Sequence, residues 1–365
     1  MNDSFSSFDS VESALADIAA GKMVIVTDDE DRENEGDLVI AAEKVTPEAV
    51  NMMATHGRGL ICAPMDGVLL DRLGISQMVP KNRESQRTAF TVSVDAARGI
   101  TTGISAYDRA QTLRILADPR SRGEDLVQPG HIFPLHARAG GVLERAGHTE
   151  AAVDLARMAG LSPAGVICEV LNEDGTMARL PQLELFKKRF GLKLICIAQL
   201  IEYRRRTEKL VETCGQWEIK TRYGTFTARQ YRSILDNSRH YALTMGALSR
   251  SPVLVRVHGE TLLADLFGAE GFSNPAGSIE RALRRIAAEG AGAFVYVGQP
   301  DGGVFQDHSV SSSSVKERDI LRTYGIGAQI LRELGLKQLR LLSNHPRRIA
   351  AIEGWGIEVS GTETF

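Results

Sequence analysis

The sequence predicts an α/β (α+β) protein with two domains. Its 365 residues exceed the size at which one hydrophobic core usually serves a whole chain. Short apolar runs typical of buried strands alternate with amphipathic segments of helical period in both halves. A basic cluster at residues 203–206 ends the last helical segment of the first half, and strand-like segments restart soon after it. We therefore expect one domain at residues 1–207 and a second at residues 208–365.

The composition is that of an ordinary globular protein. Apolar residues make up 43% of the chain and charged residues 24%, with a formal net charge of −3. This balance provides no basic field, so we expect neither nucleic acid nor a membrane as a partner. No apolar segment reaches the roughly 18 residues that a membrane-spanning helix needs. Four cysteines without paired spacing indicate reduced thiols, and the first residues do not resemble a secretion signal, so a cytoplasmic location is expected.

An acidic loop at residues 28–37 lies between two apolar runs, residues 23–26 and 38–42. The runs are typical of short buried strands, which would hold the loop in place. A divalent cation would relieve the repulsion among its carboxylates, and hard cations such as Mg²⁺ take oxygen ligands. Arg32 within the loop could orient an anionic substrate group. The alternative is a solvated charged turn, which is what most charge runs are.

Helix signals mark two early segments of the chain. Asp9 or Ser10 precedes an amphipathic segment that Gly21 ends, which predicts a capped helix. Thr46 and Pro47 are typical of an N-cap followed by the first helical position. Both segments are therefore expected to be helices that flank the strands around the acidic loop.

A second group of polar residues follows residues 88–94, whose alternation of apolar and polar side chains predicts a strand. The turn that contains Thr102 precedes a helical segment and offers hydroxyl and backbone donors to a phosphate. Ser105 could equally be a simple N-cap, with Asp108 three residues further on. Both interpretations are compatible, because Ser105 would cap the helix while Thr102 faces a ligand.

Residues 145–149, Arg-Ala-Gly-His-Thr, directly precede a clear amphipathic helix. We expect Thr149 to be its N-cap, so that a phosphate could bind the free amides of the helix start with Arg145 as counter-charge. His148 would lie at the edge of that site as a metal ligand. The alternative for a lone histidine at this position is a capping or surface group.

Two further residues each have two interpretations. Glu169 lies at the end of an apolar strand predicted at residues 163–170, where it is either an exposed strand end or a general base. Cys62 lies in a short predicted strand, where it is either a small buried hydrophobe or a thiol at the mouth of a site.

Four segments together resemble 3,4-dihydroxy-2-butanone 4-phosphate synthase, an enzyme of riboflavin biosynthesis. They are the acidic string at residues 31–37, Gly-His-Ile-Phe-Pro-Leu at 130–135, Arg-Ala-Gly-His-Thr-Glu at 145–150, and Gly-Val-Ile-Cys-Glu at 165–169. The segments occur in the family's order over about the first two hundred residues. The resemblance implies conversion of D-ribulose 5-phosphate into L-3,4-dihydroxy-2-butanone 4-phosphate and formate.

The resemblance also implies which residues bind metal and substrate. Glu33 and His148 would hold Mg²⁺ or Mn²⁺, with two ions in each site, and the family implies a homodimer. The residues implied to contact the substrate are Arg32, Glu33, Asp37, Thr102, Arg145, Ala146, Gly147, His148, Thr149 and Glu169.

Proton transfer is assigned to a smaller set by the same resemblance. His131 and Glu169 are the implied acid and base, assisted by Asp37 or Glu35. The family's cysteine near the substrate corresponds to Cys62, which favours the second interpretation of that residue.

The second half resembles GTP cyclohydrolase II, most closely at residues 256–260, 324–331, 341–346 and 354–356. That family binds zinc through three cysteines, whose positions here are Thr261, Phe272 and Asn274. No cysteine follows Cys214 in the sequence, and neither a hydroxyl nor a phenyl ring replaces a thiolate ligand. We therefore expect no zinc and no GTP cyclohydrolase activity, but a structural, dimerising or regulatory domain.

Four alternatives stay open at this point. Arg256 and Glu260 match the family and leave weak nucleotide binding possible in the second domain. A bifunctional enzyme would need an unusual zinc site, and a different metal-dependent sugar-phosphate isomerase or lyase would release no formate. A non-enzymatic binding or regulatory module would show ligand-dependent stability without turnover.

Overall fold

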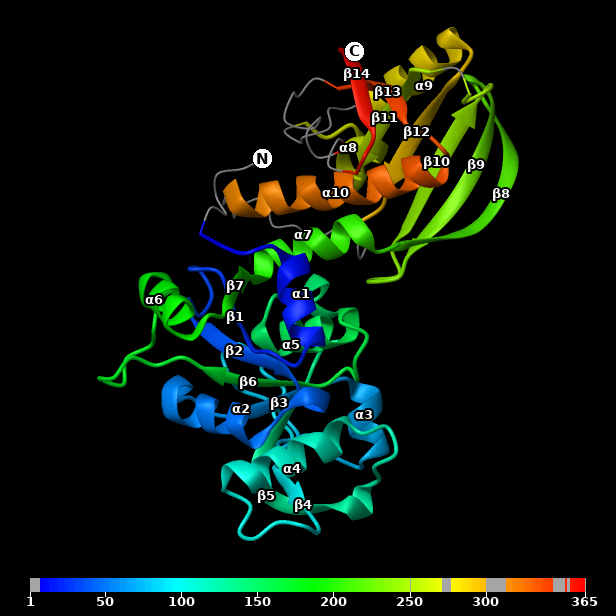
Figure 1. The fold of residues 1–365 in the computed structure, drawn as a ribbon. Helices are drawn as coiled ribbons and strands as arrows, with labels where there is room; N and C mark the ends of the chain where they lie inside the picture. The colour runs from blue at the N-terminus through cyan, green and yellow to red at the C-terminus, as the bar shows by residue number, and fades with distance from the viewer. Residues whose placement is uncertain are drawn as a thin grey trace. The chain divides into compact units, whose positions relative to one another are not determined.

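The computed structural model describes residues 7–249, 251–270, 277–299, 313–343, 352 and 355–364. The chain forms two compact units, Met1–Arg204 and Arg205–Phe365. Each unit is a layered α/β structure built on its own seven-stranded sheet (Figure 1). The predicted α/β class and the presence of two sheet-bearing domains are confirmed.

The first unit has a mixed sheet of strand order β4-β5-β3-β6-β2-β1-β7. Two pairs, β1 with β7 and β3 with β5, are parallel, and the other neighbours are antiparallel. The strands are β1 Val24–Thr27, β2 Gly36–Ala41, β3 Cys62–Met65, β4 Val94–Ala96, β5 Leu126–His136, β6 Gly165–Glu169 and β7 Lys193–Cys196.

The central strands of this sheet are buried on both sides, because helices cover both of its faces. Alternate strand residues contribute to two cores: Ile25 and Leu38 pack with α2, α3, α4 and α6, whereas Val24 and Val39 pack with α1, α5 and α7. The helices are α1 Val11–Ala19, α2 Pro47–Met52, α3 Gly67–Arg72, α4 Ala106–Ala117, α5 His148–Met158, α6 Leu180–Phe190 and α7 Ile197–Thr207, with short turns η2 Ala42–Lys44, η3 Met53–Gly57, η4 Gly123–Asp125 and η5 Gly141–Leu143.

The predicted helix caps near the start of the chain are confirmed. The Ser10 side chain accepts a hydrogen bond from the amide of Ser13, and the Thr46 side chain accepts one from the amide of Ala49. Ser105 caps α4 in the same way. These caps satisfy free amides at the starts of the three helices.

Two local predictions were wrong. Residues 88–94 form no continuous strand: isolated bridges occur at Phe90 and Thr91, and β4 begins only at Val94. Gly147, not Thr149, is the N-cap of α5, because Gly147 still has extended backbone while His148 is already helical.

The second unit has strand order β14-β13-β11-β12-β10-β9-β8. Helix α10 packs on one face of the sheet and α9 packs on the other. Its elements are β8 Val211–Thr221, β9 Gly224–Ser233, β10 Arg239–Met245, β11 Val253–Gly259, α8 Leu262–Phe267, α9 Ser278–Glu289, β12 Gly292–Val297, α10 Ser313–Glu333, β13 Gln338–Leu342 and β14 Glu358–Glu363.

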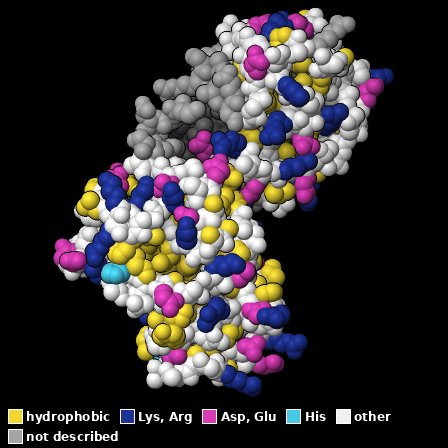
Figure 2. All heavy atoms as spheres, viewed as in Figure 1, with side chains coloured by type: hydrophobic (Ala, Val, Ile, Leu, Met, Phe, Trp, Pro, Cys, Tyr) yellow, Lys and Arg dark blue, Asp and Glu magenta, His cyan; other side chains and the backbone are white. Residues whose placement is uncertain are grey.

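Acidic and basic side chains are mixed over the face shown in Figure 2. This distribution agrees with the small net charge of −3 and with the expectation of no extended basic surface on that face. Within the described ranges, no helix combines the length and the apolar character that crossing a membrane requires.

Candidate active site

The acidic loop is held in shape by the carboxylate of its first residue, Asp28. This side chain, which is almost fully buried, accepts hydrogen bonds from the amides of Glu33 at 3.1 Å and Glu35 at 2.9 Å. It also accepts one from the guanidinium of Arg32 at 2.7 Å. Because β1 and β2 pair directly on either side of the loop, Asp28 folds the intervening residues into one fixed turn.

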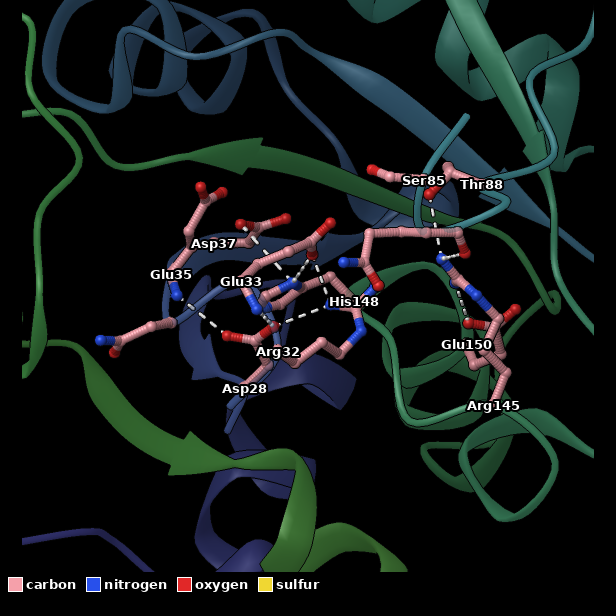
Figure 3. A network of polar contacts seen from close by, with 12 residues as sticks. Asp28, Arg32, Glu33, Glu35, Asp37, Ser85, Thr88, Arg145, His148 and Glu150 are labelled. Carbon is pink, nitrogen blue, oxygen red and sulfur yellow. Dashed lines mark hydrogen bonds and ion pairs between the residues drawn. The ribbon is translucent and has the colours of Figure 1, made fainter. Parts of the chain in front are cut away.

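His148, the first residue of α5, lies 6% exposed against this turn. Its Nε2 atom donates to the carbonyl of Val26 in β1 at 3.1 Å, which directs Nδ1 toward the carboxylates (Figure 3). Nδ1 lies 3.8 Å from Glu33 Oε2 and 4.0 Å from Asp37 Oδ1. Although burial opposes the charged form, Asp37 and Glu33 raise the pKa of His148 to about 9.

The three carboxyl groups of the turn have different protonation behaviour. Burial raises the pKa of Asp37 to about 7, while the neighbouring His148 opposes that rise. Burial, together with the charges of Glu33 and Glu169, also raises the pKa of Glu35. His148 and Arg32 hold the pKa of Glu33 below its usual value. Glu33 is therefore ionised at neutral pH, whereas Asp37 can gain or lose a proton there.

A cation fits this cluster. Ligand atoms of Asp28, Glu33 and His148 lie within 4.8 Å of one another. The Oδ1 atom of Asp37 beside them is buried and has no hydrogen-bond partner. An orphaned carboxylate oxygen is costly unless a cation or proton satisfies it. The two carboxylates supply the oxygen ligands that Mg²⁺ and Mn²⁺ prefer, and the imidazole would add a nitrogen ligand.

Glu169 lies on β6, the strand beside the Asp37 strand β2, and Cys62 lies on β3, on the other side of β6. Asp37 and Glu169 are direct register partners in β2 and β6, so their side chains share one face of the sheet. Glu169 Oε2 accepts a hydrogen bond from the amide of Leu60 at 2.8 Å. Cys62 is 3% exposed, and burial raises the pKa of its thiol far above neutrality. It is therefore a neutral thiol, not a thiolate nucleophile.

Arg145 is tied to protein groups in this structure. Its guanidinium donates to Glu150 at 2.6 Å and to the hydroxyl of Thr88 at 2.9 Å (Figure 3). A Cβ at Gly147 would approach Arg145 Nη1 to 2.5 Å, so a side chain there would push the guanidinium away from its present position. Arg32 is likewise paired, with Asp28 and Glu33. A phosphate must compete with these carboxylates for either arginine.

The remaining residues of that motif differ in exposure. Thr149 is buried at 4% exposure, whereas Ala146 is exposed. The first amides of α5 have no helical acceptor, as at any helix start, and they provide donors for an anion.

His131 and Thr102 form a second group on β5 and the turn before α4. The Asp95 carboxylate accepts from the amide of His131 at 2.9 Å and lies 2.6 Å from its Nδ1 atom. Gly103, at φ +91°, lies against this pair, since a Cβ there would approach Asp95 Oδ2 to 2.2 Å. Thr102 is exposed beside it. Within residues 7–204, no hydrogen bond or ion pair joins this group to the acidic turn.

Three contributors to the site were missing from the sequence-based assignment. Asp28 belongs to the acidic loop, but its role as the organiser of the turn depends on contacts that only the hairpin creates. Glu150 is a carboxylate within the buried face of α5, a signal that could have identified it. Asp95 and its contact with His131 have no local sequence signal.

In the second unit, the residues that match the GTP cyclohydrolase II pattern form hydrogen bonds with other side chains and with the backbone. His258 lies 2.9 Å from Asp265, which also accepts from the amide of Thr261. Arg256 donates to the carbonyl of Leu342, and Glu260 accepts from the amide of Gln299. Of the three positions expected to lack zinc cysteines, Thr261 is the N-cap of α8, whereas Phe272 and Asn274 lie outside the described residues.

Comparison with known proteins gives two family matches. Residues 12–203 match the 3,4-dihydroxy-2-butanone 4-phosphate synthase family, and residues 212–364 match the GTP cyclohydrolase II family. A riboflavin biosynthesis protein RibBA from Aquifex aeolicus is 50% identical over 96% of this chain and 91% of its own length. A RibBA protein from Bacillus cereus is 48% identical over 96% and 92%.

Solved structures agree with these matches. The two-domain 3,4-dihydroxy-2-butanone 4-phosphate synthase RibBX from A. baumannii has a TM-score of 0.77 and 43% identity over 98% of this chain and 99% of its own. A synthase crystallised with two magnesium ions has a TM-score of 0.53 and 43% identity over 55% of this chain and 98% of its own. The chain belongs to the 3,4-dihydroxy-2-butanone 4-phosphate synthase family, with a second domain of the GTP cyclohydrolase II family.

Proposed function

We propose that the first unit converts D-ribulose 5-phosphate into L-3,4-dihydroxy-2-butanone 4-phosphate and formate, and that this reaction depends on Mg²⁺ or Mn²⁺, with two ions in each site. The observation that supports it most directly is the buried, unsatisfied Asp37 Oδ1 beside the cluster of Asp28, Glu33 and His148. A related synthase has been crystallised with two magnesium ions. A bound divalent cation would stabilise the oxygens of the enediolate that forms when a proton leaves the carbon next to the carbonyl.

Within this proposal the acidic turn divides two tasks. Glu33 and His148 would hold the cation, because Glu33 is ionised and the Nδ1 atom of His148 faces it; binding of the cation would displace the proton that His148 carries at neutral pH. Asp37, whose pKa is about 7, accepts and returns protons at neutral pH, and Glu35, whose pKa burial raises, assists it. Glu169 shares the face of Asp37 and is the second proton-transfer group. No redox cofactor is required, since the products together have the same atoms as the substrate.

The phosphate would bind at the start of α5. The amides there are directed out of the helix, and Arg145 lies beside them. Arg32 would orient the substrate from the opposite side of the turn, and Thr102 would add a hydroxyl contact. Ala146, Gly147 and Thr149 belong to the same binding segment.

His131 acts as an acid or base in this scheme, and its Nδ1 contact with Asp95 determines which ring nitrogen is available. Cys62 contributes as a neutral, buried thiol close to Asp37 and Glu169. We also propose a homodimer, as the family resemblance implies, and a cytoplasmic location, as the unpaired cysteines indicate. Light scattering of the purified protein tests the homodimer, and fractionation of the source cells tests the location.

The second unit matches GTP cyclohydrolase II but lacks thiolates for that family's zinc, since no cysteine follows Cys214. We propose that it has no such activity and serves as a structural or regulatory domain. The family match favours the opposite candidate, a bifunctional enzyme, and GTP turnover distinguishes the two.

Formate release tests both parts of the proposal. The purified chain is given ribulose 5-phosphate with Mg²⁺, the same mixture with EDTA, and separately GTP with Zn²⁺. We expect formate from the sugar phosphate alone and its loss on chelation. Formate from GTP would contradict the proposal for the second unit, and no formate from ribulose 5-phosphate would contradict the proposal for the first.

A further inference from the structure

Arg179 reaches the acidic turn from 146 residues further along the chain. It is the N-cap residue of α6, and its Nη1 atom donates to the backbone carbonyl of Glu33 at 2.8 Å. The same nitrogen also donates to the carbonyl of Asn34. Two consecutive carbonyls of the proposed cation-binding turn are therefore held by one guanidinium. We propose that Arg179 is a positioning residue that holds this turn so that the side chain of Glu33 stays directed at the cation cluster.

Two features of the turn favour its opening. Asn34 has φ +54°, a left-handed conformation that few side-chain-bearing residues adopt, although asparagine tolerates it better than most. The carboxylates of Glu33 and Glu35, on both sides of Asn34, repel one another. A charged donor shared by two carbonyls opposes both effects, and hydrogen bonds from arginine are among the stronger ones.

Helix α6 supplies a rigid base for the guanidinium. Its Leu183 lies directly against Gly36 at the exit of the turn, where an added Cβ would approach the Leu183 side chain to 2.4 Å. Leu183 itself is 1% exposed and belongs to the core of the first unit. The position of Arg179 is thus determined by core packing and not by the loop that it holds.

The contact with the turn is separate from the capping of α6. The amide of Arg179 donates to the Gln182 side chain at 3.2 Å, whereas its guanidinium contacts Glu33 and Asn34. No ion pair between Arg179 and a carboxylate occurs within residues 7–204. Because the arginine binds backbone, the carboxylates of Glu33 and Glu35 stay available to the site. Substitution of Gln182 therefore provides a matched control that affects the cap alone.

The inference deepens the proposed function, and its test does not depend on turnover. Hydrogen exchange at residues 28–37 is measured in the metal-free full chain for wild type, Arg179→Gln, Arg179→Lys and Gln182→Ala. Mg²⁺ binding is measured by calorimetry on the same proteins. We expect about ten-fold faster exchange and about ten-fold weaker Mg²⁺ binding in Arg179→Gln, because local opening becomes easier when a charged hydrogen bond is lost. Arg179→Lys keeps a charged donor, so its exchange rate and Mg²⁺ affinity should lie between those of wild type and Arg179→Gln. If Arg179→Gln does not fold, Arg179→Lys is compared with wild type in its place.

Two results would overturn the inference. One is exchange at residues 28–37 in Arg179→Gln that equals the wild-type rate. The other is an equal acceleration in Gln182→Ala, which would assign the effect to the stability of α6 alone. If wild type releases no formate, the proposed reaction fails, yet the exchange data still decide whether Arg179 holds the turn.

Discussion

Arg204 and Asp154 form a deeply buried ion pair in the first unit, and this pair allows a quantitative prediction. Arg204 Nη1 lies 2.7 Å from Asp154 Oδ2, with side-chain exposures of 8% and 1%. The same nitrogen donates to the carbonyl of Gly140, and Asp154 accepts from the amide of Val142. The pair thus joins α5 and α7 to the loop that leads to Arg145.

Replacement of Arg204 by methionine keeps much of the side-chain volume but leaves the Asp154 carboxylate without its main partner. Loss of one partner of a buried pair costs about 3–5 kcal/mol. Arg157 Nη1 still lies 3.5 Å from Asp154, so we expect the lower end, about 3 kcal/mol. For a unit of this size that corresponds to a fall in melting temperature of about 6–12 °C.

The effect of pH on this cost has a definite sign. Burial raises the pKa of Asp154 even though Arg204 opposes the shift, and without Arg204 the pKa would rise further. An acid whose folded pKa exceeds its unfolded value contributes stability that is lost as the pH rises through the folded pKa. The variant should therefore lose more stability than wild type between pH 4 and pH 7, and the difference between them should be smaller at pH 5 than at pH 7.

The two tryptophans of the chain, Trp217 and Trp355, both lie in the second unit, which supplies an internal control. Urea unfolding is followed by circular dichroism, which reports on both units, and by tryptophan fluorescence, which reports on the second alone. We expect Arg204→Met to move the circular dichroism transition to lower urea concentration and to leave the fluorescence transition nearly unchanged. Two results would refute the reasoning. One is a loss of less than about 1 kcal/mol in the free energy of unfolding on Arg204→Met, and the other is an undiminished loss when the same substitution is made in the Asp154→Asn variant.

Three further predictions concern the site. Glu33→Gln should abolish turnover and weaken Mg²⁺ binding without changing the circular dichroism spectrum, and an active variant would contradict the role of Glu33 as a ligand. Asp95→Asn should lower kcat about 10–100-fold and shift the pH profile, because the carboxylate no longer orients His131; a change in KM alone would indicate a binding role. Gly147→Ala should lower activity and thermal stability together, since the new methyl group displaces the Arg145 guanidinium; wild-type behaviour in both assays would show that the helix start tolerates a side chain.

Local signals explain which parts of the fold could be predicted. The caps at Ser10 and Thr46, and the strands on both sides of the acidic loop, depend on neighbouring residues only. The predicted strand at residues 88–94 fails because its residues bridge two different partners, Gln77 and Leu135, instead of one continuous strand. Strand pairing depends on distant residues, so alternation alone cannot decide it.

The site shows the same division between local and distant information. Residues of the acidic turn and His148 could be identified from chemistry and motif order, and the structure brings them together. The engagement of Arg145 by Thr88 could not be foreseen, because it joins residues 57 positions apart. Arg179 was absent from the prediction for the same reason, since an arginine that binds backbone carbonyls has no sequence signature.

The second unit shows that a matched motif residue need not mark an active site. Arg256 is 2% exposed and donates to the carbonyl of Leu342, so it joins β11 to β13 across the sheet. Glu260 accepts from the amide of Gln299, the residue that follows β12 and Gly298. Both contacts stabilise the sheet whether or not a nucleotide binds. Loss of zinc chemistry would therefore leave these two residues in place for structural reasons alone, and their presence is no argument for GTP turnover.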